Sequence, residues 1–427
     1  MALTEFQKKH LDDIYNKCLS CGLCLPTCPT YNLDLREESS PRGRIKLIHS
    51  IQNDKLPLSK LFIDEMYFCL DCQACETACP AGVHFGELVE EARNIIHDKK
   101  QEPVSISILK KIFLNYILSS PEKTKKAFKL LRLYQKSGLK DAVEQSNILK
   151  VFSDKLHHKH QLLPTVDERF FDEEFAEILS PKQGIRGRVA FLTGCIMNVA
   201  FAKIHRDAVR VLLLNGFEVI IPKNQNCCGS LHAHNGEIEF AKKLARKNIE
   251  YFEKFNFDSI IVDSAGCGAF MKEYGRILID DDAFKDRASM FSSKVKDISE
   301  FLIEVGLTRE PKHLKKKVTY HDACHLVHTQ KISQQPRKLI QSIPGIEFIE
   351  LSESSWCCGS AGIYNIVRFD DSMKILERKM INIRSTNANV VITANPGCHL
   401  QIQFGIKKYG LKMEVMHPVS LLSEAYH

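Results

Sequence analysis

The second half of the chain alternates short apolar runs with longer stretches whose apolar residues recur at helical spacing. Mainly apolar, strand-like segments begin at Arg188, Phe217 and Ser259, and each has the length of a buried strand. The stretch after each run places its apolar residues on one face, as an amphipathic helix does. Strands that alternate with helices are typical of parallel α/β units. We therefore predict a parallel sheet with covering helices over residues 186–310.

The same order of runs recurs over residues 311–427. Strand-like runs begin at Lys317, Ile346 and Val390, and a helical stretch precedes the last of them. A repeat on this scale indicates two supersecondary units of one kind. The fold class that we predict is therefore multidomain, with two repeated α/β domains at 186–310 and 311–427.

Cysteines follow the predicted strands in both halves, and their spacing agrees to within one position. Each half places a Cys-Cys-Gly sequence between two single cysteines. The first set is Cys195, Cys227, Cys228 and Cys267, and the second set is Cys324, Cys357, Cys358 and Cys398. Ligands of parallel α/β sheets gather beyond the carboxyl ends of the strands. We therefore expect these eight side chains to converge on one face.

Three roles fit this arrangement of thiols. Soft thiolates favour a further iron–sulfur centre, a thiol–disulfide centre would use the same side chains, and buried free cysteines also occur as small hydrophobic residues. Matched positions in both halves disfavour the last role. His321, His325 and His399 flank the cysteines, where a histidine is a ligand, a proton relay or a hydrogen-bonded structural residue.

Residues 1–98 carry the pattern C-x2-C-x2-C-x3-C-P twice, which is the bacterial signature of [4Fe–4S] clusters. Three thiolates at this spacing wrap around one cube, and the fourth, which lies beyond a turn fixed by proline, serves the other cube. Two complete runs disfavour zinc, and disulfides would need an oxidising compartment. We assign the first cluster to Cys18, Cys21, Cys24 and Cys79, and the second to Cys69, Cys72, Cys75 and Cys28.

The insert between the two cysteine runs contains Arg42 and Arg44 ahead of a helical stretch. Residues 86–97 also show helical spacing. We therefore expect residues 1–98 to form a mainly helical ferredoxin domain. The two arginines either line a docking surface, lower the electrostatic cost of the anionic clusters, or are solvated.

Residues 99–185 contain no cysteine and are expected to form a helical basic connector. Within it, residues 121–140 are amphipathic and rich in lysine, so this segment either packs on the neighbouring domains or lies on an anionic membrane surface. Residues 155–160 include three histidines, which indicate either a metal-binding tract or a solvated linker.

The composition is ordinary for a globular protein, with 427 residues, 26 % charged, 44 % hydrophobic and a net charge of +7. This charge excess does not by itself imply nucleic-acid binding. Sixteen cysteines are many for a cytosolic chain, which favours metal ligation. The first residues have no apolar signal core, and no apolar run approaches the ~20 residues that span a bilayer. We expect a cytoplasmic protein that associates with the inner face of the membrane only peripherally.

Taken together, these features resemble a family in which a two-cluster ferredoxin domain precedes two Cys-Cys-Gly domains. It includes heterodisulfide reductase subunits, the C subunit of anaerobic glycerol-3-phosphate dehydrogenase and, most similar, the glycolate oxidase iron–sulfur subunits. The segments that carry the resemblance are Cys28–Tyr31, Pro41–Ile45, Ala265–Phe270, Lys272–Gly275, Cys357–Gly362 and Ile392–Asn395. The resemblance implies a subunit that takes electrons from flavoproteins oxidising glycolate to glyoxylate and passes them to a quinone-type membrane acceptor.

One departure concerns the CxxC that closes heterodisulfide reductase-type domains. Here Cys267 is followed by Gly268–Phe270 and Cys398 by His399–Gln401. Each half therefore lacks one ligand of that pattern. The sequence fits both a repeat that holds a third iron–sulfur centre and a repeat that holds none.

The chain has no Gly-x-Gly-x-x-Gly fingerprint of a flavin site, and we assign it no catalytic residue. Cubane clusters pass single electrons, whereas oxidation of an alcohol carbon needs a flavin or nicotinamide. We therefore expect an electron-transfer subunit of an oxidoreductase, with FAD on a partner subunit. The alternatives are a subunit of a lactate or glycerol-3-phosphate dehydrogenase, a thiol or heterodisulfide reductase acting at the Cys-Cys-Gly face, and a non-redox scaffold.

Overall fold

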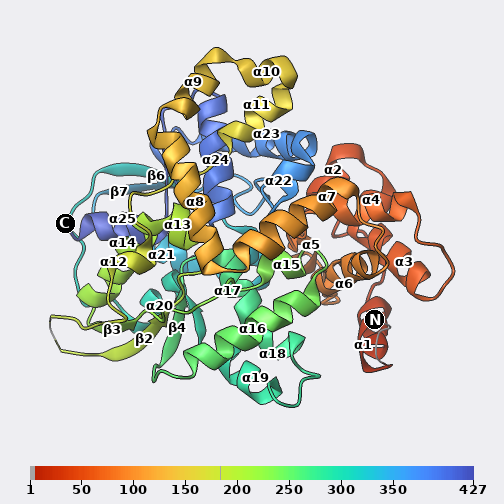
Figure 1. The fold of residues 1–427 in the computed structure, drawn as a ribbon, viewed down its shortest axis with the longest axis horizontal. Coiled ribbons are helices and arrows are strands. Elements are labelled where there is room, and N and C mark those ends of the chain that lie inside the picture. Colours follow the sequence, from red (N-terminus) through yellow and green to blue (C-terminus); the bar gives the residue numbers. More distant parts are fainter. Residues whose placement is uncertain (1–4, 183) are drawn as a thin grey trace.

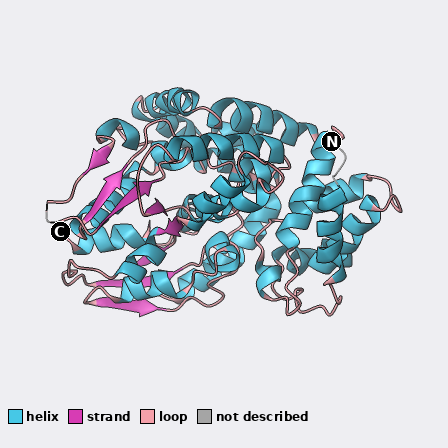
Figure 2. Cartoon of the chain, turned by 90° about the horizontal axis from the view of Figure 1, so that it is seen from below, coloured by secondary structure: helices cyan, strands magenta, loops and turns pink. Residues whose placement is uncertain are grey.

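A computed structural model describes residues 5–182 and 184–427 of the chain. A helical amino-terminal domain lies at one end of the molecule, and two α/β halves lie at the other (Figure 1). Seen from below, the strands gather on the side opposite the amino-terminal helices (Figure 2). The predicted fold class, a helical ferredoxin domain followed by two α/β units with parallel strands, is confirmed.

All regular elements described between residues 5 and 98 are helices. They are α1 (Glu5–Asn16), α2 (Pro29–Asp34), η1 (Glu37–Ser39), α3 (Pro41–Gln52), α4 (Lys60–Phe68), α5 (Ala74–Thr77) and α6 (Phe85–Asp98). Helix α3 begins at Pro41 because proline suits the first helical turn, and the Ser40 side chain caps it by accepting a bond from the Gly43 amide. This start fixes Arg42 and Arg44 in the first turn of α3.

A chain of helices connects this domain to the sheets. It comprises α7 (Val104–Leu109), the π-helix η2 (Lys110–Leu118), α8 (Pro121–Lys136), α9 (Leu139–Ser146), α10 (Ile148–Phe152), α11 (Asp154–Gln161) and α12 (Phe171–Glu174). Phe128 of α8 is buried in a core that contains residues of both α/β halves. The amphipathic segment therefore packs on its neighbours, as one of the two predictions for residues 121–140 states.

The first half, from residue 178 to 305, follows the predicted alternation. Its elements are β1 (Ile178–Leu179), β2 (Gly187–Phe191), α13 (Ile196–Ala200), α14 (Ala202–Leu214), β3 (Phe217–Ile220), α15 (Ser230–Ala233), α16 (Ile238–Phe252), β4 (Ser259–Val262), α17 (Ala265–Lys272), α18 (Tyr274–Ile277), α19 (Lys285–Ser293), β5 (Val295–Asp297) and α20 (Ile298–Val305). Its sheet has the order β1-β3-β2-β4-β5, in which only β1 runs antiparallel.

The second half repeats this plan. Its elements are β6 (Lys316–Tyr320), the π-helix η3 (His325–Thr329), α21 (Gln334–Gln341), β7 (Ile346–Ile349), α22 (Tyr364–Val367), α23 (Phe369–Ser385), β8 (Val390–Ile392), α24 (Pro396–Lys408), β9 (Glu414–Met416) and α25 (Pro418–Ala425). The sheet order β7-β6-β8-β9 is all parallel and matches β3-β2-β4-β5 strand for strand.

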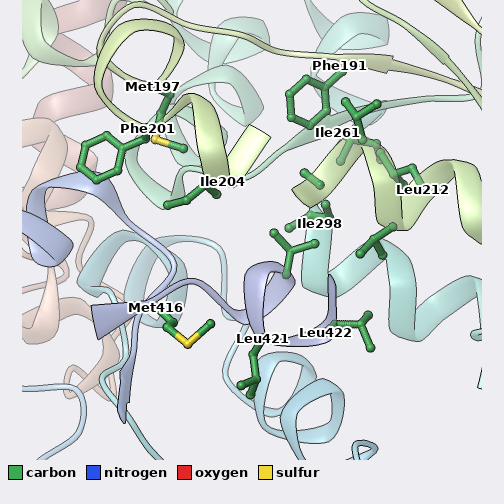
Figure 3. Packing of buried hydrophobic residues seen from close by; sticks show 14 of the residues in the cluster. Phe191, Met197, Phe201, Ile204, Leu212, Ile261, Ile298, Met416, Leu421 and Leu422 are labelled. Atoms are coloured by element: carbon green, nitrogen blue, oxygen red, sulfur yellow. The ribbon is translucent and has the colours of Figure 1, made fainter. Parts of the chain in front are cut away.

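The two halves share one hydrophobic core. One cluster contains Phe191, Ile261 and Ile298 of the first half together with Leu421 and Leu422 of the carboxy-terminal helix, and Ile298 lies between the other two groups (Figure 3). Helix α14 packs on α25, and α20 packs on α21. Burial of apolar surface therefore joins the halves into one body, with the carboxyl ends of both sheets held in fixed relation. Among the described residues, no helix combines the length and apolar character that crossing a bilayer requires.

Candidate metal centres

The first predicted cysteine set lies near the surface of the amino-terminal domain. All four members, Cys18, Cys21, Cys24 and Cys79, line one small cavity beside the first turn of α3. Gly22 lies between them with a φ of 88°, and a Cβ there would stand 2.9 Å from the Arg42 guanidinium. A glycine is needed at this turn because left-handed backbone and close approach occur together.

The second set is buried. Cys28, Cys69, Cys72 and Cys75 are all enclosed, and the chain turns around them through left-handed residues at Asp71 and Gln73. Burial raises the pKa of Cys75 well above its usual value, and the neighbouring Cys72, Cys28 and Cys69 add to the rise. The structure thus brings together the four side chains that the crossed assignment grouped.

A buried ion pair lies beneath the second set. The Arg44 guanidinium is fully enclosed and lies 3.1 Å from the Glu65 carboxylate. It also donates to the Thr30 hydroxyl at 2.9 Å and to the Ser39 carbonyl at 2.6 Å. Burial opposes its charge, but the nearby Cys69, Cys28 and Glu65 raise the pKa of Arg44 overall.

The burial of Arg44 corrects one prediction. A side chain with no exposed surface cannot line a docking surface, and it is not solvated. Its position instead suits the remaining prediction, in which a cation lowers the electrostatic cost of anionic groups nearby. Arg42 is half-buried and donates to the Glu37 carboxylate and to the Ser20 carbonyl beside the first set.

In the first α/β half, the loops after three parallel strands place the cysteines. Cys195 follows β2, Cys227 and Cys228 follow β3, and Cys267 lies in α17 after β4. The Cys195 thiol lies 3.6 Å from the sulfur of Cys227, and Cys228 contacts Cys267. The hydrogen bond to Cys227 and burial together raise the pKa of Cys195. The strands thus deliver all four thiols to one point.

The second half repeats this geometry. Cys324 contacts Cys357, and Cys358 contacts Cys398. Gly359, like Gly229 in the first half, has a positive φ, 88° against 94°. The left-handed glycine turns the backbone sharply after the paired cysteines, so that both thiols face the same centre.

One cavity of about 490 Å³ joins the two sets, and all eight cysteines of the repeat line it. The sequence prediction did not anticipate that the connector would close this cavity. Apolar side chains from η2, α8 and the segment after α11 complete its wall, namely Phe113, Ile117, Phe128, Leu131, Leu162 and Leu163. The only sequence signal for this role was the apolar face of the amphipathic connector.

The buried amino-terminal set adjoins the second half. Burial raises the pKa of Cys72, and the nearby Cys324 adds to the rise. Cys72 in turn is one of the groups that raise the pKa of Cys357. Three groups of thiols therefore follow one another from the surface to the centre of the molecule: the first set near the surface, the buried second set and the eight cysteines around the cavity between the halves.

Arg93 of α6 holds this junction together. Its guanidinium donates to the Met66 carbonyl at 2.8 Å and the Cys69 carbonyl at 2.5 Å in its own domain, and to the His234 carbonyl at 2.6 Å in the first half. The backbone of α6 also lies so close to Gly236 that a Cβ there would stand 2.3 Å from the Arg93 oxygen. This clamp fixes the amino-terminal domain against the repeat.

His234 lies at the same junction and was not among the predicted residues. Its Nδ1 is 3.1 Å from the Asp71 carboxylate and 2.6 Å from that of Glu90. Burial alone would lower the pKa of His234, but these two contacts raise it to about 10. The sequence offered no signal for this cluster because its members lie in three separate segments.

The predicted histidines occupy different surroundings. His321 lies within 4.8 Å of Cys358 and Cys398, atom to atom, and Nδ1 of His325 lies 3.4 Å from the Cys324 sulfur. His399 instead packs on the ring of Phe201. In the histidine-rich tract, His157 is buried and His158 stacks on Phe369, so packing replaces the predicted solvated linker.

The donor chemistry of these sites fits iron–sulfur clusters. All sixteen cysteines are free thiols, which leaves no disulfide among the residues that the structure describes. Buried thiols bind metal as thiolates, and a bound cation offsets the cost of their charge. Grouped soft donors with little water around them select iron–sulfur clusters over hard cations.

Comparison with known proteins agrees with this architecture. The chain matches a 4Fe-4S dicluster domain over residues 14–83, the linker region of the glycolate oxidase iron-sulfur subunit over 106–163, and a cysteine-rich domain twice, over 189–272 and 318–403.

Individual relatives show the same organisation. The chain is 39 % identical to a probable glycolate oxidase iron-sulfur subunit from Bacillus subtilis, across 99 % of this chain and 96 % of the relative. It is 29 % identical to lactate utilization protein A from Oceanobacillus iheyensis, across 55 % of this chain and 96 % of that protein. A hypothetical protein from Helicobacter pylori shares the fold, with a TM-score of 0.55 at 10 % identity over 99 % of this chain and 73 % of that chain. The predicted resemblance is confirmed: the chain belongs to the family of glycolate oxidase iron–sulfur subunits.

Proposed function

We propose that this chain is the iron–sulfur electron-transfer subunit of a flavin-dependent 2-hydroxyacid dehydrogenase, with glycolate as the substrate of the complex. It receives electrons from an FAD-bearing partner and delivers them to a quinone-type acceptor at the membrane. The observation that carries this proposal is the unbroken series of thiol groups, from the surface set through the buried set to the central cavity. Iron–sulfur clusters, when bound there, accept and release single electrons.

The amino-terminal ligands are proposed from the groupings in the structure. Cys18, Cys21, Cys24 and Cys79 would hold one [4Fe–4S] cluster, and Cys28, Cys69, Cys72 and Cys75 the other. The Arg44 guanidinium offsets part of the negative charge of the buried set, because it lies close enough to Cys69 and Cys28 for these thiols to raise its pKa. The eight cysteines around the cavity would hold a third iron–sulfur centre or one in each half.

The exposed end of the series offers a surface for the flavoprotein. Leu19 is 76 % exposed and Leu23 58 % exposed, and both flank the exposed Cys21. Apolar side chains left in water beside a redox site mark a protein contact. We place electron entry at this end.

The acceptor end is proposed at the connector. Val151 and Phe152 of α10 are exposed, and Lys150 lies between Leu149 and Val151 in the same helix. Exposed apolar side chains beside lysines suit a peripheral contact with anionic lipid. The same connector lines the central cavity with apolar residues, and this apolar wall supports a lipid-soluble acceptor for the electrons.

Reconstitution tests the proposal. Anaerobically purified chain should contain about eight irons or more, be reducible by dithionite, and show no glycolate oxidation alone. Addition of the flavoprotein partner with glycolate should reduce its clusters, and a soluble quinone should reoxidise them. A chain that binds zinc, or whose clusters stay oxidised with the reduced flavoprotein, would contradict the proposal.

The thiol-lined cavity also favours one second candidate, reduction of a disulfide substrate by the repeat. The same preparation separates the two. Dithionite-reduced chain that cleaves an added disulfide, without any partner and without quinone reduction, would identify it as a thiol or heterodisulfide reductase.

A further inference from the structure

We propose that each Cys-Cys-Gly half completes its metal centre with one buried histidine, His321 in the second half and His232 in the first. This inference rests on the proposed function in one respect, namely that the cysteine sets of the repeat hold metal. It assigns a nitrogen donor to each centre, where the cysteine pattern alone offers four sulfur donors.

The second half shows the arrangement most directly. His321 follows the end of β6, and its amide donates to the Ile392 carbonyl of β8 at 2.9 Å, which fixes the backbone. Its ring has no exposed surface. One ring nitrogen and the sulfurs of Cys358 and Cys398 all lie within 4.8 Å of one another. The end of β6 therefore holds the imidazole beside the sulfurs of Cys358 and Cys398.

Neither ring nitrogen of His321 has a hydrogen-bond partner. The backbone of Ser354 approaches the ring without a hydrogen bond of normal geometry. In a buried imidazole without partners, the lost hydration of both nitrogens is not compensated. A metal ion bound at one nitrogen offsets that loss, and the Ser354 carbonyl would orient the ring as such backbone groups commonly do.

The first half has a histidine in the same condition. His232 lies in the short helix α15, has no exposed surface, and has no hydrogen-bond partner on either nitrogen. It stacks on Phe240 with the ring centroids 4.6 Å apart. It also lies close enough to Cys227 to act with Cys195 and Cys228 in lowering the pKa of that thiol.

A structural histidine in the same domain shows the contrast. His205 is equally buried, but its Nδ1 lies 2.7 Å from the Asp263 carboxylate and its Nε2 lies 2.9 Å from the Thr193 carbonyl. Buried polar groups in folded proteins are satisfied in this way. His321 and His232 break the rule, and both do so beside thiols.

The two histidines do not occupy equivalent places in the repeat. His321 stands three residues before Cys324, where the first half has Leu192 before Cys195. His232 stands four residues after Cys228, where the second half has Gly362 after Cys358. Each half therefore reaches its thiols with a histidine by its own route.

A nitrogen donor changes the chemistry of such a centre. Imidazole is neutral where a thiolate is anionic, so the centre holds less negative charge and is easier to reduce, as in iron–sulfur proteins with mixed ligands. Each half also lacks the closing CxxC of heterodisulfide reductase-type domains, and a histidine supplies a donor in its place.

Pulsed electron paramagnetic resonance tests the proposal. The full chain is produced with isotopically labelled histidine and then reconstituted with iron and sulfide. We expect a label-dependent nitrogen coupling that His321→Leu removes from one centre and His232→Leu from the other. His205→Asn serves as the control, because that ring is held by protein groups and should leave both couplings unchanged.

A second variant guards against failure to fold. His321→Cys supplies a thiolate at the same site, so we expect full iron content, no nitrogen coupling in that centre and a lower reduction potential. Iron above about eight per chain without any label-dependent coupling would overturn this inference and leave the proposed function standing. Iron of about eight per chain, with both cubane clusters present, would overturn it because the repeat would then hold no centre.

Discussion

The two α/β halves have one backbone plan and different polar interiors. Their parallel strands follow the same order, and their cysteines reach the same cavity. Beneath the paired cysteines, however, Asn248 supports the first half and Lys379 the second. The comparison shows that the repeat holds the thiols by its backbone, whereas single side chains decide the charge around each set.

The two supporting side chains stabilise corresponding loops through hydrogen bonds to the backbone. Asn248 accepts a bond from the Asn226 amide at 2.9 Å and donates to the Cys227 carbonyl at 3.1 Å. Lys379 donates to the Ser354 carbonyl at 3.1 Å and also to that of Glu353. Both tie down the loop before the cysteine pair. Burial lowers the pKa of Lys379 to about 8, while the thiols of Cys358 and Cys357 oppose the shift.

The largest expected effect is the loss of the iron of one half while the iron of the other half stays bound. Cys228→Ser should remove the iron of the first half only, and Cys358→Ser that of the second half only, because each thiol is central to its own set. Iron content and electron paramagnetic resonance of each variant measure this. Loss of the same signal in both variants would show a single shared centre and break the comparison.

Substitution of the two turn glycines should give the next largest effect. In Gly359→Ala the new Cβ would stand 2.7 Å from the Ser372 carbonyl oxygen, whereas in Gly229→Ala it would stand 3.1 Å from the Phe270 ring. Left-handed strain costs each variant about 1–2 kcal/mol. The backbone clash should bring the loss in Gly359→Ala to roughly 3–4 kcal/mol. Thermal unfolding measures the difference, and equal losses would contradict it.

The buried lysine should tune the reduction potential of the second-half centre more than that of the first. A unit charge about 10 Å away, at an effective dielectric constant of about 20, is worth roughly 1.7 kcal/mol, or about 70 mV for one electron. Lys379→Met should therefore lower the reduction potential of the second-half centre by tens of millivolts and that of the first-half centre by less, because the Coulomb energy falls with distance. Lys374→Met, an exposed lysine of the same helix, is the control and should shift neither because solvent screens its charge.

The smallest effect concerns the residues that cap the last helix of each half. Asp297 accepts a bond from the Ser299 amide before α20, and His417 accepts one from the Val419 amide before α25. Burial raises the pKa of Asp297 to about 7 and lowers the pKa of His417 to about 4. The two caps therefore titrate in opposite senses.

Their contributions to stability should offset each other. As pH rises from about 4 to 7, the contribution of Asp297 to the free energy of unfolding falls, because Asp297 keeps its proton to higher pH in the folded state than in the unfolded state. The contribution of His417 rises over the same range, because the unfolded state binds more protons there than the folded state does. Denaturation curves should show a stability that rises with pH in Asp297→Asn and falls with pH in His417→Asn. The same slope in both variants would contradict this account.

The backbone of the repeat was predictable from the sequence because strand lengths, helical stretches and cysteine intervals recur in the same order in both halves. The charge of its interior was not. Lys379 lies in an amphipathic helix, where a lysine indicates a solvated face until the loop that covers it is known. His232 lies in a helix of four residues, which is too short to produce a periodic signal.

Long-range pairings were hidden for a similar reason. The Ala265 amide donates to the Ala394 carbonyl at 3.0 Å and so joins the halves beside the cavity. Backbone groups carry no sequence signature, so this contact follows only from the packed fold. Arg44 shows the converse case, since its sequence context indicated three roles and only its burial decided among them.

The Arg93 clamp has a consequence for the dynamics of the molecule. Carrier domains in some redox proteins swivel between donor and acceptor, and their turnover depends on that travel. Here the Arg93 guanidinium donates hydrogen bonds to backbone oxygens on both sides of the domain boundary. These bonds hold the ferredoxin domain in one position relative to the repeat. In the proposed complex the pace of the relay is therefore set at its two ends, by the arrival of the flavoprotein and the departure of the acceptor.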